Sequence, residues 1–141
     1  MKRRVFLLGV GGAICAAPFE PILSKPKPFV VGYMSEGVTG GSMLRTFRGA
    51  MGALGYAEGT DYTIVERAAE GRTERLPGLA ADLVAQRVDI IVTASGSPAP
   101  VAAKAATRTI PIVMISAQSP VEDGLVESLG QPGGNVTGML S

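Results

Sequence analysis

The stretch VDIIVTASGSP, residues 88–98, decides the fold class of this 141-residue chain. Residues 89–92 form a short, mainly apolar run rich in β-branched side chains, which predicts a strand buried on both faces of a parallel sheet. Small hydroxylated residues follow, and Pro98 then begins a helix with Ser97 as its N-cap. Such a turn directs backbone N–H groups and hydroxyls to one place, where open α/β sheets bind small polar or anionic ligands. The same loop is equally compatible with a plain, tight connection.

A strand followed by a helix recurs along the whole chain. The expected strands are residues 29–34, 62–66, 89–92 and 109–115, and a short extended piece is expected at 135–137. The helices are expected to begin near Met43, Thr73, Pro98 and Ser119, with Thr73 as an N-cap and Gly55 ending the first helix. Residues 62–66 alternate between polar and apolar, which indicates an edge strand. This rhythm predicts an α/β fold, a doubly wound parallel sheet with right-handed crossovers and helices on both faces.

Composition and charge argue against several classes of function. A net charge of +1, with no Lys/Arg cluster outside the N-terminus, argues against a nucleic-acid partner. Because the chain has no histidine and one cysteine, neither a zinc-type metal site nor a Ser–His catalytic pair is expected. The sequence also lacks a dinucleotide fingerprint and a phosphate-binding GK[ST] loop, so no cofactor is expected. Glu66 and Glu70 are expected to be exposed charges and not a catalytic pair, so no enzymatic activity is predicted.

Residues 1–27 are expected to form a signal peptide and a linker. Lys2, Arg3 and Arg4 form a charged region, and the apolar run at 5–17 is too short to span a membrane as a helix. The twin arginines resemble a twin-arginine export signal, and an ordinary secretory signal is the alternative. After cleavage, the chain is not expected to span a membrane.

Small polar residues occur where the predicted strands end. Ser35 follows the first strand, Ser95 and Ser97 follow the third, and Ser116 follows the fourth. Because the carboxyl ends of parallel strands meet at one edge of a sheet, these serines are expected to lie together at the place where such folds bind ligands. Glu36 lies near the same edge and is a candidate partner for a ligand ammonium group.

Four stretches make the chain resemble a known family. They are GYAEG (55–59), EGRTERLPGLAADLV (70–84), TIPIV (109–113) and GLVESLGQPGGNVTG (124–138). The chain resembles the N-terminal half of the ABC-transporter substrate-binding proteins of the tryptophan/tyrosine type, which have the type I periplasmic-binding-protein fold. The resemblance implies a solute-binding component of an ABC importer in the periplasm. Such a component captures a small molecule, such as an amino acid, between two lobes and delivers it to an ABC permease in the inner membrane.

The resemblance also assigns parts and residues. Residues 28–134 would form the N-terminal lobe, and residues 135–141 would begin the hinge crossing to a second lobe. The residues that would face the ligand are Ser35, Glu36, Ser95, Gly96, Ser97, Ser116 and Ala117. The residues that would form the hinge are Asn135, Val136, Thr137 and Gly138.

The length of the chain departs from the family. Such two-lobed receptors are roughly twice as long, so a truncated product without the second lobe is expected, and it should bind ligand weakly on its own. The alternative function is a ligand-sensing lobe of a regulator with the same fold. That function would require a DNA-binding helix pair or a signalling domain, and this sequence contains neither.

Overall fold

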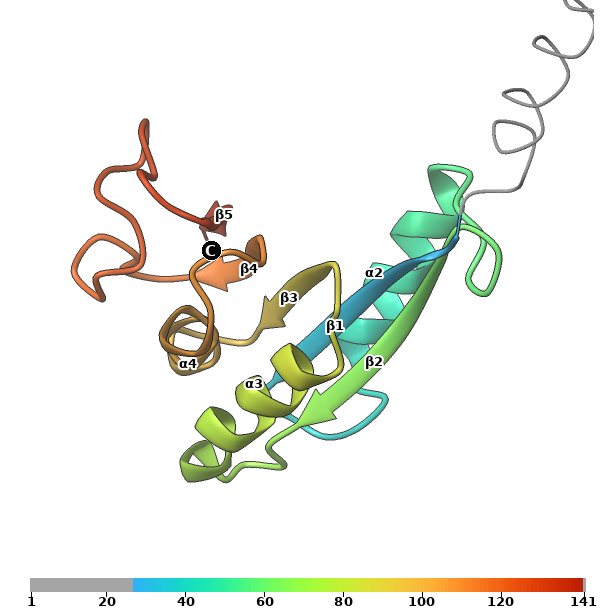
Figure 1. Ribbon diagram of the computed structural model, residues 1–141, viewed down its shortest axis with the longest axis horizontal. Helices are drawn as coiled ribbons and strands as arrows, with labels where there is room; N and C mark the ends of the chain where they lie inside the picture. The colour runs from blue at the N-terminus through green and yellow to red at the C-terminus, as the bar shows by residue number, and fades with distance from the viewer. Residues whose placement is uncertain (1–26, 141) are drawn as a thin grey trace, which may run out of the picture.

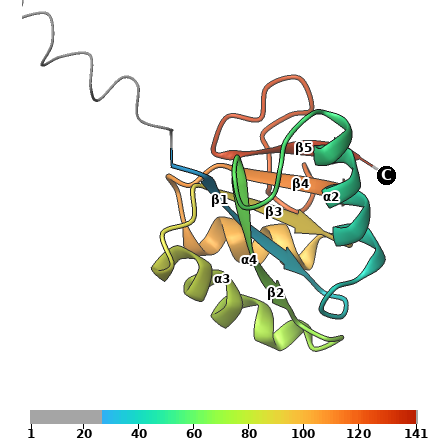
Figure 2. The ribbon, with the colours of Figure 1, turned by 90° about the vertical axis from the view of Figure 1, so that its right-hand side faces the viewer.

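The computed structural model describes residues 27–140, and its centre is a sheet of five parallel strands in the order β2-β1-β3-β4-β5. The strands are β1 (Phe29–Ser35), β2 (Tyr62–Ala68), β3 (Ile90–Ala94), β4 (Ile112–Ala117) and β5 (Val136–Leu140). Their order along the sheet can be followed in Figure 1, and Figure 2 shows β1 and β3 running toward the same side. The predicted α/β fold with a parallel sheet is therefore confirmed.

Helices cover both faces of this sheet, as the doubly wound arrangement predicts (Figure 1). The helices are α2 (Ser42–Ala53), the 3₁₀ turn η1 (Thr73–Arg75), α3 (Leu76–Ala85) and α4 (Pro98–Ala106). Successive residues of a strand point to opposite faces, so Tyr33 packs in one apolar cluster with Leu44 of α2. Its neighbour Met34 packs in a second cluster, which contains residues of α3 and α4.

The two edge strands behave differently from the central ones. β2 lies at one edge, as its alternating sequence predicts, and most of its residues are half-buried. β5 lies at the other edge and extends the short piece expected at 135–137 into a strand paired with β4. The Asn135 amide Nδ2 donates hydrogen bonds to the carbonyl oxygens of Thr107 (3.2 Å) and Ile110 (2.8 Å), which fixes the start of β5. The role of this segment as a crossing between lobes stays a prediction.

Three local predictions differ from the structure. No helix begins at Ser119: a single turn forms, in which Asp123 N donates to Ser119 O (2.9 Å), and Gly124 at φ +69° ends it. Thr73 begins η1 and does not cap α3, whose N-cap position is Arg75, because the 3₁₀ turn comes first. Ser97 does occupy the N-cap position of α4 and Pro98 its first residue, but the Ser97 hydroxyl makes no capping hydrogen bond.

The α2 side of the sheet is only partly covered. A groove of about 500 Å³ separates α2 from β3 and β4, and almost every side chain that lines it is apolar. Val92 of β3 and Val113 and Ile115 of β4 contribute to its floor. The opposite face of the same strands packs against α3 and α4, so the two faces of β4 differ sharply in burial.

No helix within residues 27–140 is long and apolar enough to cross a membrane. The predicted signal peptide and its twin arginines lie outside the described residues.

Candidate functional site

The carboxyl ends of β1, β3 and β4 are level with one another. Ser35 pairs with Ala94, and Ala94 pairs with Ile115, so the ends of three neighbouring strands meet at one edge of the sheet. Ser95 follows β3 directly and Ser116 lies next to Ile115, so Ser35, Ser95 and Ser116 come together at this edge. These three serines therefore lie at the same edge of the sheet, as predicted.

Two of these serines adopt an unusual backbone conformation. Ser95 has φ +72° and Ser116 has φ +67°, the left-handed region that costs a non-glycine residue roughly 1–2 kcal/mol. Such conformations persist only where the surrounding structure imposes them, and they gather at ligand-binding turns. Ala117, which follows Ser116, is fully buried, and it packs in the apolar cluster against α3 and α4.

Glu36 turns its carboxylate toward the turn after β3. Its Oε1 atom is buried and has no hydrogen-bond partner among residues 27–140, and a Cβ built on Gly96 would lie 3.0 Å from it. Two backbone hydrogen bonds fix this segment: Gly71 N donates to Glu36 O (2.8 Å) and Glu70 N donates to Gly37 O (2.9 Å). Burial of the carboxyl group raises the pKa of Glu36 above its ordinary value of 4.5.

The raised pKa of Glu36 predicts a pH-dependent gain from Glu36→Gln. The folded state holds the proton of Glu36 more tightly than the unfolded state, so ionisation lowers stability as the pH rises above about 4.5. Glu36→Gln should therefore raise Tm at pH 7, and the gain should vanish below the ordinary pKa, where both states are protonated. Thermal unfolding followed by circular dichroism from pH 3.5 to 7.5 would measure it, with exposed Glu74→Gln as the matched control. An equal gain in Tm at every pH would contradict the assignment of a raised pKa to Glu36.

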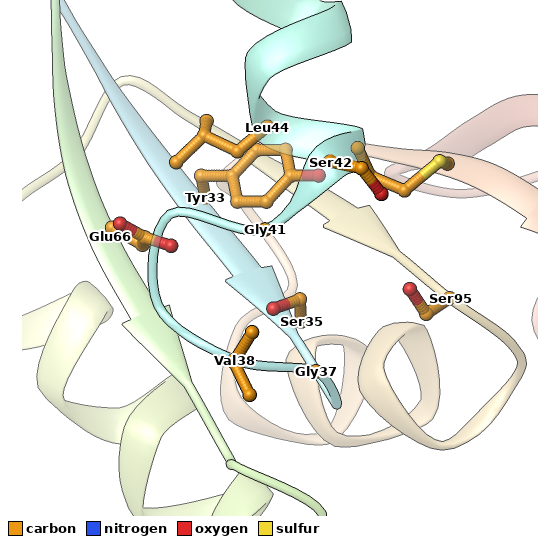
Figure 3. Close-up of a pocket in the computed structure, with 10 residues that line it drawn as sticks. Tyr33, Ser35, Gly37, Val38, Gly41, Ser42, Leu44, Glu66 and Ser95 are labelled. Carbon is orange, nitrogen blue, oxygen red and sulfur yellow. The ribbon is translucent and has the colours of Figure 1, made fainter.

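A pocket of about 180 Å³ lies at this edge, between the end of β1 and the start of α2 (Figure 3). Its lining residues are Tyr33, Ser35, Gly37, Val38, Gly41, Ser42, Met43, Leu44, Glu66 and Ser95. Ser35 and Ser95 are the two residues of the predicted set that line it. Glu36, Gly96, Ser97, Ser116 and Ala117 lie outside its lining, although all of them belong to the same strand ends and turns.

The expectation that Glu66 is exposed was wrong. Its side chain is half-buried, and its Oε1 atom accepts a hydrogen bond from the Gly40 backbone N–H (2.7 Å). The cause is the period of two along β2: Tyr62 is buried on the α2 face, so Glu66 points to that face as well. That alternation is the signal that could have found it. Glu70 is exposed, as predicted. Its Oε2 atom lies 3.6 Å from the Nη1 atom of Arg75.

Tyr33 and Ser42 are further pocket residues that the sequence did not single out. Tyr33 lies inside an apolar strand, where a tyrosine is expected to be a core residue. Ser42 is the first residue of α2. Only the approach of the α2 N-terminus to the end of β1 brings them together. Within residues 27–140, no group of three or more His, Cys, Asp or Glu side chains could hold a metal ion.

Known proteins match both the sequence and the fold. The pattern of the ABC transporter substrate binding protein family matches residues 34–140. A tyrosine-binding protein of Clostridioides difficile (strain R20291) is 39% identical over 84 residues, which are 60% of this chain and 24% of that protein.

Three solved structures share the fold. The ABC domain from Streptococcus pneumonia in complex with L-Trp has a TM-score of 0.72 and 25% identity, over 81% of this chain and 39% of that one. A ligand-free, open substrate binding protein with adhesive properties from Clostridium difficile has a TM-score of 0.71 and 26% identity, over 79% and 38%. A conserved domain protein of Vibrio cholerae has a TM-score of 0.73 and 30% identity, over 82% and 39%.

The chain thus spans about a quarter of the curated relative and about two fifths of each solved structure. This share fits a single lobe, and the resemblance found in the sequence is confirmed. The chain belongs to the family of ABC transporter substrate-binding proteins.

Proposed function

We propose that this chain is the solute-binding lobe of an ABC importer, which captures a small molecule and delivers it to a permease in the inner membrane. The observation that carries this proposal is the convergence of Ser35, Ser95 and Ser116 at the carboxyl edge, beside a pocket. Open α/β sheets bind their ligands at this edge. Two strained turns support a site there, as does the buried Oε1 atom of Glu36, which has no hydrogen-bond partner in the described part of the chain.

The proposed ligand is an aromatic amino acid. The support is the printed description of two relatives, one a tyrosine-binding protein and the other a domain in complex with L-Trp. The ligand would contact residues that the resemblance assigns, with Gly96 and Ser97 offering backbone groups and Glu36 a carboxylate, whereas the buried Ala117 would shape the site from below.

The proposed organisation has three parts. Residues 1–27 are a signal peptide and linker, 28–134 the lobe, and 135–141 the start of the crossing to a second lobe, with Asn135 to Gly138 as the hinge. The receptor would act in the periplasm, exported by the twin-arginine or the ordinary secretory route. It would bind and release its solute without chemical change. The alternative, a sensing lobe of a regulator, gains no support from a family of transport proteins.

Titration of the 141-residue chain with L-tyrosine and L-tryptophan tests this function. Because one lobe leaves half of the ligand in water, we expect a Kd on the order of a millimolar, not a micromolar.

Ser95→Ala should weaken binding by about two- to tenfold, because one hydrogen bond to the ligand is lost. Thr46→Ala removes an exposed hydroxyl from α2, outside the lining of the pocket, and should leave Kd unchanged. Two-dimensional NMR would follow the amides of residues 35–42 and 94–97, and unchanged signals would contradict the proposal.

A further inference from the structure

The groove between α2 and strands β3 and β4 is an open apolar surface that the proposed solute site does not use. Among residues 27–140, it shares no lining residue with the pocket of Ser35 and Ser95. Figure 1 shows α2 apart from β4, and Val113 and Ile115 of β4 are accordingly only half-buried. Its volume of about 500 Å³ is that of a small-molecule site, and such sites are mostly apolar with a few fixed polar groups.

Two carboxylates bracket one end of this groove. Within the described part of the chain, Asp61 and Asp89 are the charged residues of its lining, and both are exposed. They lie beside the first residues of β1, because Phe29 N donates to Asp61 O (3.0 Å) and Val30 N donates to Asp89 Oδ2 (2.8 Å). β2 and β3 lie on opposite sides of β1. Asp61 and Asp89 therefore stand on the two sides of the same end of the groove.

Each carboxylate is held by one oxygen atom. Oδ2 of Asp61 accepts a hydrogen bond from the Ala57 N–H (2.7 Å), as Oδ2 of Asp89 does from the Val30 N–H. No residue that the structure describes donates to Oδ1 of either group, and no described lysine or arginine forms an ion pair with them. Both carboxylates are thus fixed in place with an oxygen atom and a negative charge left for a ligand.

Two exposed aromatic rings lie at the same end. Phe29 is 67% exposed and Tyr56 is 51% exposed, and both line the groove. Tyr56 directly precedes Ala57, whose N–H binds Asp61, and Phe29 is the first residue of β1. Aromatic faces attract organic cations, and carboxylates attract the same charge over a longer range. This end of the groove therefore favours a positive group and disfavours an anion.

We propose that the groove is a second binding site, which takes an organic cation with an apolar body. The cation lies between Asp61 and Asp89. The apolar body lies on the floor formed by Val92, Val113 and Ile115, where its burial supplies the affinity. This site is distinct from the proposed solute site, because its charged end lies at the amino ends of the strands and the serines lie at their carboxyl ends.

Three probes with the same phenylbutyl body test the proposal on the 141-residue chain. They are (4-phenylbutyl)trimethylammonium, uncharged 4-phenyl-1-butanol and 4-phenylbutanoate. Two-dimensional NMR would give each Kd from the amide signals of residues 29–31 and 112–115. The cation should bind about tenfold more tightly than the anion, with the alcohol between them, because two carboxylates attract one and repel the other. Equal Kd values for cation and anion, or unchanged signals from these amides, would overturn the proposal.

Substitutions at the charged end test the role of the carboxylates. Asp61→Asn combined with Asp89→Asn removes both charges and keeps an oxygen atom for each backbone N–H, so the preference for the cation should nearly vanish. Asp123→Asn removes an exposed carboxylate outside the groove lining and should leave the preference unchanged. A preference that survives the double substitution would overturn the proposal. If that variant does not fold, titrations of the parent chain in 0.05 M and 0.5 M NaCl decide, since salt should narrow the difference between cation and anion.

A substitution on the floor tests where the apolar body lies and what else could cover the groove. Val113→Lys should weaken binding of the cation by about tenfold, because it places a like charge on the apolar floor; unchanged binding would overturn the proposal. If sedimentation shows a dimer that dissociates in Val113→Lys, a second copy covers the groove and the proposal is wrong. If the cation binds only after Leu8→Asp, the groove belongs to the apolar run at 5–17, which lies outside the described residues, and the proposal is again wrong.

Discussion

Replacement of Met114 by lysine is expected to unfold the chain, whereas replacement of its neighbour Val113 by lysine is expected to leave it folded. Met114 is 4% exposed and packs in the cluster between the sheet, α3 and α4. A lysine there would bury an unpaired charge at a cost of several kcal/mol, and a domain of this size has only about 5–15 kcal/mol of stability. Far-ultraviolet circular dichroism and a urea titration would measure the loss.

Val113 points to the opposite face and lines the groove beside α2. Its side chain is half-buried, so a lysine could extend its ammonium group into water along the groove. The variant should keep a cooperative unfolding transition and should bind less of the dye ANS than the parent chain, because a charge interrupts the apolar surface. Unfolding of Val113→Lys to the same extent as Met114→Lys would show that the groove is closed in solution.

Replacement of Gly138 by alanine is expected to have the second-largest effect. Gly138 has φ +151° and pairs with Met114 of β4, and a Cβ at this position would collide with the Met114 carbonyl oxygen. Backbone strain of about 1–2 kcal/mol and overpacking of about 1–3 kcal/mol should together lower the free energy of unfolding by roughly 3 kcal/mol. Hydrogen exchange should also show faster exchange for the β5 amides.

Gly134→Ala is the matched control for this substitution. No atom lies within 4 Å of a Cβ at Gly134, and its φ lies outside the left-handed region. Its unfolding midpoint should change by less than that of Gly138→Ala, and β5 should stay protected. Equal midpoints for the two variants would mean that β5 does not pair closely with β4 in solution.

The elements that the sequence predicted well are those whose pattern is local. Residues 89–92 read as a buried strand because of their β-branched run, and the Ser97-Pro98 pair marked the start of α4. The alternation of 62–66 identified an edge strand. Once the strands are parallel, their carboxyl ends must meet, so the serines at those ends could be placed at one edge without coordinates.

The parts that could not be predicted depend on contacts between distant residues. The shape of the pocket depends on the Glu66–Gly40 hydrogen bond, which joins residues 26 positions apart. A helix was predicted to begin at Ser119, but only one turn forms, because Gly124 ends it. Leu125 and Val126, which follow, are both buried in the core. The sequence predicted Tyr33 as a core residue, and it is buried. That its hydroxyl lacks a hydrogen-bond partner among residues 27–140 can be recognised only from the structure around it.

The segment between β1 and α2 is tied to β2 and to the residues after it at three points, by Glu66 to Gly40 and by the backbones of Glu70 and Gly71 to Gly37 and Glu36. Ordering a mobile loop consumes part of the affinity of most small-molecule receptors. Here the wall of the pocket is already fixed, so, under the proposed function, little entropy should be lost on this side when a solute binds. The proposed closure of two lobes would then be a hinge motion in which this lobe moves as a rigid body, and differences in affinity would arise on the opposite side of the proposed site.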